Sequence, residues 1–330
     1  SVNSETLAAI PVASATEALQ GKMAGVQITT TEGSPDAQMS IRVRGGGSIT
    51  QSNEPLFIVD GFPVESISDI PPTDIESIDV LKDASSTAIY GARGANGVII
   101  VTTKSGKEGK VSVSYNAYYA WKKVAKTLDV LSASDYTKWQ YELAQLTNKN
   151  DDYIKYFGNY QDLDMYDNVA TNDWQDLTFG RTGHSFNHNL SINGGSDKFK
   201  YSFSYSHIDD KAIMQMSDYA RDNLNLKLNH KPLKNVSLDF SARFSKTKIN
   251  GGGSNDANSS LNTDKRLKYS LLYTPYPVPG ISDALNADEE DANSLLINPL
   301  ISLRDNDTRK ERINYNLAGS ITWEIIKDLK

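Results

Sequence analysis

The sequence predicts an α+β unit over residues 1 to 107, followed over residues 108 to 330 by the first antiparallel strands of a transmembrane β-barrel. Three observations predict this fold. Short helical and strand-like segments mix before residue 107, whereas later segments alternate strictly between apolar and polar residues. Very long connections alternate with very short ones between these later segments. No run of about 18 apolar residues exists, so no membrane-spanning helix is expected.

The N-terminal region predicts a small mixed sheet with short helices. A helix capped by Ser14 or Thr16 is expected to end at Gly21. A second short helix is expected from Ala84 to Tyr90, with Gly91 as its stop. Strand-like segments occupy Val26–Thr30, Met39–Val43, Leu56–Val59, Ile75–Leu81 and Gly97–Thr103. The Asp60-Gly61 pair directly after the third of these segments predicts a tight turn.

The C-terminal region predicts six strands in which every second residue is apolar. They are centred on Val111–Tyr119, Asn187–Asn193, Phe199–Tyr205, Asn223–Asn229, Val236–Phe244 and Tyr315–Trp323. Most approach the roughly 9–11 residues that a tilted strand needs to cross a bilayer. Half-buried strands of a soluble sandwich alternate in the same way, so alternation alone does not establish a membrane barrel.

The connections favour the barrel over the sandwich. Gly194–Asp197 and Lys231–Lys234 are tight turns, whereas residues 121–186 and 246–312 form very long links. Outer-membrane barrels combine short periplasmic turns with long extracellular loops in this manner. Aromatic residues near the strand ends fit the girdles found at membrane interfaces, namely Tyr118, Tyr119, Trp121, Tyr219 and Trp323.

Composition excludes several classes of function. Lys and Arg total 34 against 41 Asp and Glu, and this net charge of -7 argues against nucleic acid as a partner. The absence of cysteine excludes disulfides and thiolate chemistry. His184 and His188 would lie about 13 Å apart on one strand, too far to share a metal ion. No catalytic residue, cofactor or metal is therefore expected, and the chain is not predicted to be an enzyme. As an alternative use of its acidic residues, the run 288–291 could bind calcium in a loop.

Four segments resemble the plug domain of SusC/RagA-type TonB-dependent outer-membrane transporters. They are ALQGKMAGVQI at 18–28, IRVRGGGS at 41–48, PLFIVDGFPV at 55–64 and DIESIDVLKDASSTAIYGARGANGVIIVTTK at 74–104. Together they cover most of residues 16 to 104. The resemblance implies a plug lodged inside a 22-stranded barrel. It also implies that a signal peptide, an extension domain and a TonB-contacting box lie upstream, and that most barrel strands lie downstream.

The resemblance further implies TonB-dependent active import of an oligosaccharide or peptide, with a SusD-like lipoprotein as the lid. The implied location is the outer membrane of a Gram-negative, Bacteroidota-like cell, and TonB would act through a segment upstream of this chain. One alternative is an outer-membrane receptor of the same fold that senses ligand without importing it. Another is a soluble extracellular β-rich glycan-binding protein. No nucleic acid partner is expected.

Polar contacts between plug and barrel can break and re-form singly, whereas a dry core resists until it fails. We therefore expect Arg42, Arg44 and Arg93 to meet lumen-facing acids such as Asp239. Gly45, Gly46, Gly47 and Ser48 are expected to form a loop at the plug apex, and Tyr90, Gly91, Arg93 and Asn96 a tight signature turn. Aromatic residues of the long loops are candidate contacts for substrate or lid, namely Trp139, Tyr156, Tyr273 and Tyr276.

Overall fold

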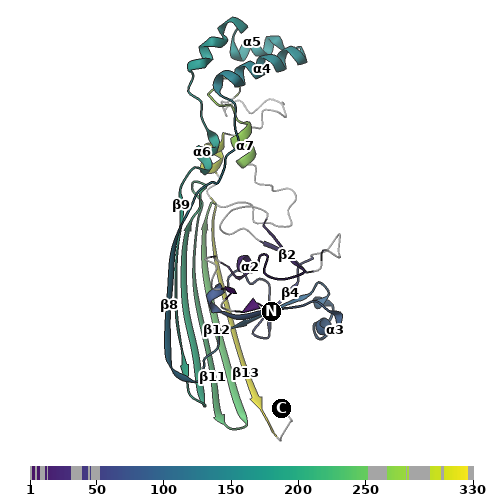
Figure 1. Cartoon of the computed structure of the whole chain (residues 1–330), viewed down its shortest axis with the longest axis vertical. Helices are drawn as coiled ribbons and strands as arrows, with labels where there is room; N and C mark the ends of the chain where they lie inside the picture. The colour runs from purple at the N-terminus through teal and green to yellow at the C-terminus, as the bar shows by residue number, and fades with distance from the viewer. Residues whose placement is uncertain are drawn as a thin grey trace.

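The computed structural model describes residues 2–3, 6–7, 12, 14–30, 39–43, 45, 53–251, 266–279, 281, 298–305 and 308–325. These residues form an N-terminal α+β unit, a tall curved sheet, and a group of helices beyond one end of that sheet (Figure 1). The described part of residues 2–107 is called the plug unit below. The long sheet is called the strand wall.

The plug unit is built on a five-stranded mixed sheet in the order β1-β6-β7-β4-β5. Its strands are β1 (Val2–Asn3), β4 (Leu56–Val59), β5 (Phe62–Val64), β6 (Ile75–Leu81) and β7 (Val98–Thr103). The β4–β7 pair is parallel, and the other pairs are antiparallel. A separate hairpin pairs β2 (Val26–Thr30) with β3 (Met39–Val43). Val59, Ile75, Ile78, Ile99 and Val101 are fully buried and form the centre of the core.

The expected local elements of the plug unit are present. The first of the two expected helices, α2 (Ala15–Ala18), is capped by Ser14, whose hydroxyl accepts a hydrogen bond from the Glu17 amide. It ends at Ala18, three residues before the expected end at Gly21. Asp60 and Gly61 both have positive φ angles, 52° and 89°, as a two-residue hairpin turn requires. The strand after that turn, β5, was not among the predicted strands. It contains Pro63 and lies at the edge of the sheet, where a strand tolerates proline.

The second expected helix is divided into two. It consists of α3 (Ala84–Thr87) and a 3₁₀ segment, η2 (Ala88–Gly94), interrupted at Gly91 with φ 58° and ψ -147°. This backbone conformation suits glycine alone, so Gly91 breaks the helix as its sequence position indicates. One further 3₁₀ turn, η1 (Pro72–Asp74), leads into β6.

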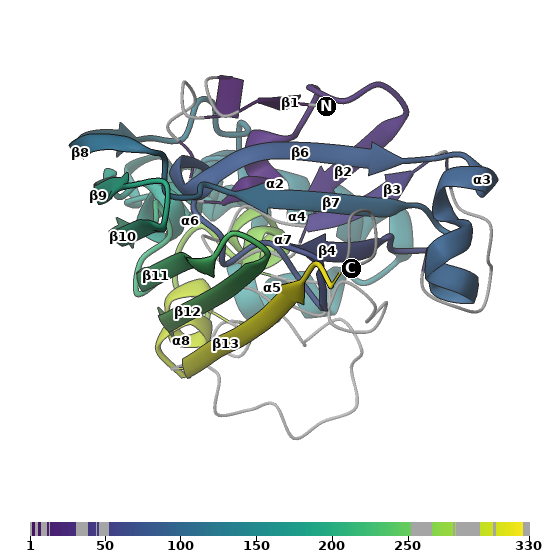
Figure 2. The ribbon, with the colours of Figure 1, turned by 90° about the horizontal axis from the view of Figure 1, so that it is seen from below.

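The strand wall is a six-stranded antiparallel sheet in the order β13-β12-β11-β10-β9-β8. Its strands are β8 (Gly109–Lys122), β9 (Gly183–Gly195), β10 (Phe199–Lys211), β11 (Asp218–Leu233), β12 (Val236–Asn250) and β13 (Arg309–Trp323). Each strand pairs with its neighbours in sequence, so the wall is a meander. The wall curves around the plug unit, which lies on its concave side (Figures 1 and 2). The sheet does not close on itself within the described residues.

The two faces of the wall differ in polarity. Outward positions carry apolar side chains that are largely exposed, including Val113, Tyr115, Phe240, Leu317 and Ile321. Inward positions carry small polar side chains that are buried beneath the plug unit, including Asn189, Ser202, Ser204, Ser206 and Thr247. An apolar outer band around a polar interior is the pattern of an outer-membrane barrel.

The outer apolar band runs obliquely across the strands. Successive paired residues connect Trp121 through His184, Lys211, Asp218 and Asn250 to Arg309 on β13. The uppermost outward aromatic residue of β13 is Tyr315, six residues below Arg309. We take Trp121 and Tyr315 to lie at the same membrane interface. Tyr315 is displaced from Trp121 by about 20 Å along the strands (six residues) and by about 24 Å across them (five strand spacings). The strands therefore tilt by roughly 40° from the membrane normal. That tilt lies within the range of known outer-membrane barrels.

The expected aromatic girdle is only partly present. Tyr119, Trp121 and Trp323 are exposed on the outward face. Tyr118 and Tyr219 instead face inward and line the space between wall and plug unit, because each stands one residue out of phase with the outward row. The girdle interpretation is therefore wrong for these two residues.

The long links fold into helices beyond one end of the wall (Figure 1). They contain α4 (Ala133–Thr147), α5 (Asn150–Phe157), η3 (Tyr160–Asn168), α6 (Trp174–Phe179), α7 (Arg266–Leu272) and α8 (Pro299–Asp305). We call α4, α5, η3 and residues 273–278 the helical cap. Among the described helices, none has the length and apolarity needed to cross a membrane.

Candidate functional site: the plug–wall interface and the helical cap

The plug unit is joined to the wall by a buried three-residue node. The Lys227 ammonium on β11 donates to the Asp60 carboxylate at 2.8 Å and to the Thr103 carbonyl at 2.9 Å. Asp60 also accepts from the Thr103 amide at 2.9 Å and from the Thr103 hydroxyl at 2.7 Å. The Lys227 and Asp60 side chains are each only 15% exposed. Removing either partner would leave the other as a buried, uncompensated charge.

A second set of contacts holds the segment before β6. The Arg221 guanidinium of β11 donates to the Ser68 carbonyl at 2.7 Å. The Asp69 carboxylate accepts a hydrogen bond from Asn314 and lies 3.9 Å from the Arg312 guanidinium, both on β13. The plug unit therefore supplies acids and carbonyl oxygens, and the wall supplies cations and amides.

Asp74 is the most deeply buried acid of the interface, at 4% exposure. Burial raises the pKa of its carboxyl above the ordinary value, while Ser204 and Asn189 on the wall, and the charges of Lys104 and Arg221, oppose that rise. The Asp74 carbonyl also accepts from the Lys104 amide at 2.8 Å. Asp74 thus ties the start of β6 to the end of β7 and faces the polar lumen wall.

The link from plug unit to wall passes very close to β10. A Cβ atom added at Gly106 would lie 2.4 Å from the Tyr201 amide nitrogen and 2.6 Å from its carbonyl oxygen. Only glycine allows the two backbones to approach this closely. Sequence reasoning missed this position, because a glycine inside a short polar link carries no signal of its own.

The structure reverses the polarity that was expected of the interface. Asp239 accepts a hydrogen bond from Asn229 on the neighbouring strand, and it contacts no described arginine of the plug unit. Arg42 and Arg93 are exposed, and Arg44 lies outside the described residues. Arg42 lies on β3, and Arg93 on η2 lines the cavity between the plug unit and the wall. The sequence could not tell which charged residues of the plug unit would pair with these six strands.

Two glycine-containing segments of the plug unit were expected to form an apex loop and a signature turn. Gly45 is exposed with a φ of 91°, whereas Gly46, Gly47 and Ser48 lie outside the described residues. In the signature turn, Tyr90, Gly91 and Arg93 belong to η2. Asn96 donates to the Glu54 carbonyl at 3.4 Å, and the Leu56 amide donates to the Gly97 carbonyl at 3.0 Å. The turn therefore positions the start of β4.

A cavity of about 1290 Å³ lies between the plug unit and the wall. Most of the residues that line it are polar or charged. From the plug unit it is lined by Glu17, Asp69, Asp74 and Arg93, and from the wall by Tyr118, Lys122, Asp210, Tyr219, Arg221, Arg243, Lys310 and Arg312. No group of three or more acidic or histidine side chains in the described residues is arranged to hold a metal ion.

The helical cap joins two loops that are far apart in sequence. Tyr276 enters the core formed by α4, α5 and η3, where it packs with Tyr153, Phe157 and Leu163. Its hydroxyl lies 2.5 Å from the Thr137 hydroxyl. The Trp174 indole donates to the Thr274 carbonyl at 2.8 Å, and the Asn172 amide donates to the Pro275 carbonyl at 2.6 Å. These contacts make the cap one packed unit.

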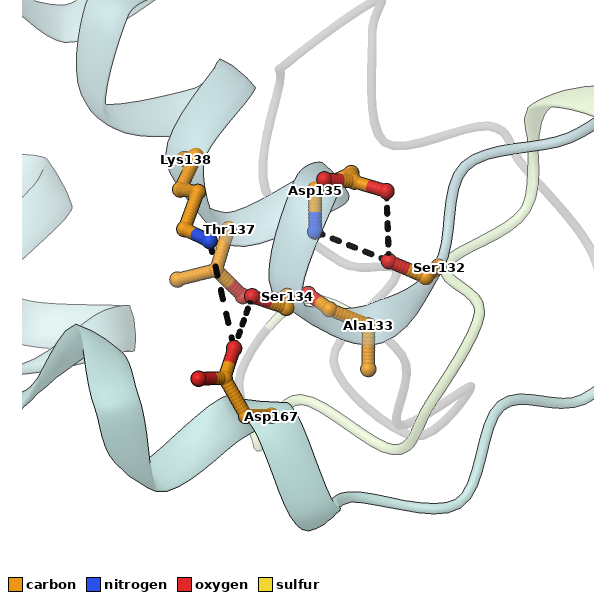
Figure 3. A network of polar contacts seen from close by, with 7 residues as sticks. All are labelled: Ser132, Ala133, Ser134, Asp135, Thr137, Lys138 and Asp167. Carbon is orange, nitrogen blue, oxygen red and sulfur yellow. Dashed lines mark hydrogen bonds and ion pairs between the residues drawn. The ribbon is translucent and has the colours of Figure 1, made fainter.

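Polar contacts fix the start of α4 within this unit (Figure 3). The Ser132 hydroxyl accepts from the Asp135 amide at 3.0 Å and donates to the Asp135 carboxylate at 2.7 Å. Asp167 of η3 accepts from the Ser134 hydroxyl and lies 3.9 Å from the Lys138 ammonium. A capped first turn and a tie to η3 set the direction in which α4 projects.

The four aromatic residues expected to contact substrate or lid fall into two groups. Tyr273 and Tyr276 are 7% and 5% exposed and pack inside the loops, so their rings are not open to a ligand. Tyr156 is half-buried, with the Lys155 ammonium 4.9 Å above its ring. Trp139 remains open at the surface of α4. Loop packing, which has no local sequence signal, accounts for the buried pair.

Helix α4 has a second apolar face that the cap does not cover. Trp139, Leu143 and Leu146 are 48%, 39% and 83% exposed. Their spacing of four and three residues places them on one side of the helix, whereas Ala133, Thr137 and Ala144 are buried on the opposite side. A helix of a soluble module ordinarily has a single apolar face.

Comparison with known proteins identifies several relatives. Residues 1–98 match the TonB-dependent Receptor Plug Domain. The chain is 40% identical over 217 residues to TonB-dependent receptor SusC of Bacteroides thetaiotaomicron, covering 63% of this chain and 20% of that protein. It is 35% identical over 314 residues to TonB-dependent receptor P26 of Formosa agariphila, covering 90% of this chain and 30% of that protein.

Solved structures give the same result for the fold. The RagAB peptide importer in its open-open state matches with a TM-score of 0.64 and 31% identity, over 75% of this chain and 30% of that one. The closed-closed state matches with a TM-score of 0.62 and 28% identity. The chain thus spans between a fifth and a third of the length of these relatives.

Proposed function

The chain belongs to the SusC/RagA-type TonB-dependent receptors of the outer membrane, of which it carries the plug and first barrel strands, and we propose that it serves active import of an oligosaccharide or oligopeptide. The observation that carries this proposal is the polar plug–wall interface. Its hydrogen bonds and ion pairs join Asp60, Ser68 and Asp69 to the wall.

A polar interface suits a plug that must move repeatedly. Each hydrogen bond can be exchanged for one to water, so the contacts can break and re-form one at a time. A dry apolar interface would have to separate in one step, at a cost that grows with the area exposed. In this proposal, TonB pulls on a segment upstream of the chain and displaces the plug unit from the wall.

Linking the plug unit to the wall covalently is expected to abolish import while leaving substrate capture intact. Because the chain contains no cysteine, Asp69→Cys and Asn314→Cys would be the only reactive thiols that this part of the receptor supplies. Their parent side chains are hydrogen-bonded, so a short bifunctional thiol reagent can bridge them. Uptake of labelled oligomer by intact cells is the measurement.

The controls for this experiment are the two single variants and a monofunctional reagent. Each should retain uptake, because neither links the plug to the wall. Continued import by the cross-linked receptor would contradict a mechanism that displaces this part of the plug.

The uncovered face of α4 is our candidate for docking a SusD-like lipoprotein. It lies at the end of the molecule farthest from the strand turns (Figure 1), where a lid above the barrel would sit. The face is apolar and the cap beneath it is packed, so its three side chains are presented in a fixed arrangement. The resemblance to SusC-type receptors, which includes the matched structures of the RagAB peptide importer, supports this choice of partner.

Leu143→Glu is expected to weaken co-purification of the lipoprotein about tenfold or more, because it places a charge in the centre of an apolar contact. Gln145→Glu is the matched control, since it adds the same charge to an exposed position of the same helix. Equal retention of the lipoprotein by both variants would show that this face is not the docking site.

A further inference from the structure

The inward face of the strand wall carries a marked excess of positive charge. Strand register places seven cations on this face, namely Lys122, Lys200, Arg221, Lys227, Arg243, Lys310 and Arg312. Only two acids, Asp210 and Asp239, share it. The excess is notable because the whole chain has a net charge of -7.

These cations are spread along the depth of the wall. Lys122 lies in the inward row nearest the helical cap, and Lys310 lies in the next row. Arg312 shares the row after that with Arg221. Arg243 lies two rows lower, Lys227 one row below it, and Lys200 near the turns. Successive inward rows are separated by about 7 Å along a strand. The positive groups thus form a ladder from the extracellular end to the periplasmic end.

The plug unit supplies the opposite charge. Residues 1–107 contain twelve Asp and Glu against seven Lys and Arg. Asp60 pairs with Lys227, Asp69 with Arg312, and Asp74 lies in the electrostatic field of Arg221. While the plug is seated, its acids therefore neutralise much of the ladder.

We propose that this ladder binds the negatively charged groups of the transported oligomer when the plug is displaced, so that the substrate carries carboxylates or sulfates. The inference rests on the import function proposed above. In the seated state the acids of the plug unit occupy the positions that substrate anions take during passage. Displacement exposes the cations on the inner face of the wall, where a line of like charges concentrates the field and attracts counter-ions.

Arg243 and Lys310 are the residues best suited to test the ladder. Both line the cavity, and neither forms an ion pair with any residue that the structure describes. Arg243 interacts with Asp60 only through the longer-range charge effect. Changing them should alter the charge offered to substrate and leave the Lys227 and Arg221 contacts of the seated plug in place.

The test is uptake by cells that produce the intact receptor with its partners. The charged probes are oligogalacturonides, sulfated oligosaccharides and a glutamate-rich peptide; the neutral probes are malto-oligosaccharides and a glycine-serine peptide. We expect at least one charged probe to be imported in preference to its neutral counterpart. Arg243→Gln with Lys310→Gln should lower that uptake about tenfold, the lower end of what electrostatic focusing contributes to association rates.

The matched control is Lys246→Gln with Lys248→Gln, which removes the same charge from the outward face of β12. This pair should leave uptake unchanged. The imported probe identifies whether the anion comes from a glycan or from a peptide. Preference for a neutral probe, or equal loss of charged and neutral uptake in the Arg243 and Lys310 variant, would overturn the inference. Failure to import any probe in a TonB-dependent manner would instead contradict the import function itself.

Discussion

Replacing Lys227 with methionine is expected to release the plug unit from the wall and make the outer membrane permeable to large hydrophilic solutes. The Asp60 carboxylate would lose its ion pair while remaining held in the turn by Thr103. Breaking one side of a buried ion pair costs about 3–5 kcal/mol, since the remaining charge stays desolvated. Sensitivity of cells to a bulky antibiotic that the intact membrane excludes measures the leak.

Two further variants make this prediction specific. Asp60→Asn combined with Lys227→Met should restore much of the seal, because it removes the orphaned charge as well as its partner. Lys200→Met removes an inward lysine that forms no hydrogen bond or ion pair with a described residue of the plug unit, and it should leave the membrane tight. If cells with the Lys227→Met receptor excluded the antibiotic as well as cells with the Lys200→Met receptor, the contacts of Lys227 with Asp60 and Thr103 would not hold the plug.

Leu226→Arg is expected to block assembly of the receptor in the outer membrane. Leu226 lies on the outward face of β11 between Phe203 and Ala242, well inside the apolar band. An arginine on the lipid face costs about 2–4 kcal/mol near the bilayer midplane. The yield of folded receptor, resolved by its mobility on gels before and after heating, provides the measurement.

The matched change on the other face should be tolerated. Ser320 lies inward on β13, where it pairs with Asp239, so Ser320→Arg places the same side chain in a polar lumen beside an acid. Normal yield is expected for this variant. An equal loss of folded receptor in the Leu226→Arg and Ser320→Arg variants would indicate that the two faces do not differ in their surroundings.

The sequence predicts the strands well because their signal is local. Alternation of apolar and polar residues depends only on the two-residue period of a strand, and the six alternating segments lie within β8 to β13. The same locality explains the Asp60-Gly61 turn and the Gly91 break, since each reflects backbone conformations open to particular residues. Resemblance of motifs then identifies the plug.

What the sequence does not predict depends on contacts between distant residues. The partners of Asp60 and Asp69 lie on β11 and β13, more than 150 residues away, and no local pattern links them. The burial of Tyr276 follows from its insertion between helices of another loop. Arg42 and Arg93 were chosen for their charge, but charge alone does not indicate which side chains of the plug unit form ion pairs with this wall.

The two-sided environment of the wall can be measured most directly by scanning β12 with single spin labels. This chain has no cysteine, so each position from Ser237 to Phe244 can be labelled alone in the receptor reconstituted in lipid, with any cysteine outside this chain replaced by serine. We predict that accessibility to oxygen peaks at Leu238, Phe240, Ala242 and Phe244. A water-soluble relaxation agent should reach the positions between them instead. Uniform accessibility along the strand, or protection of both faces from lipid and water alike, would contradict the assignment of this sheet to an outer-membrane barrel.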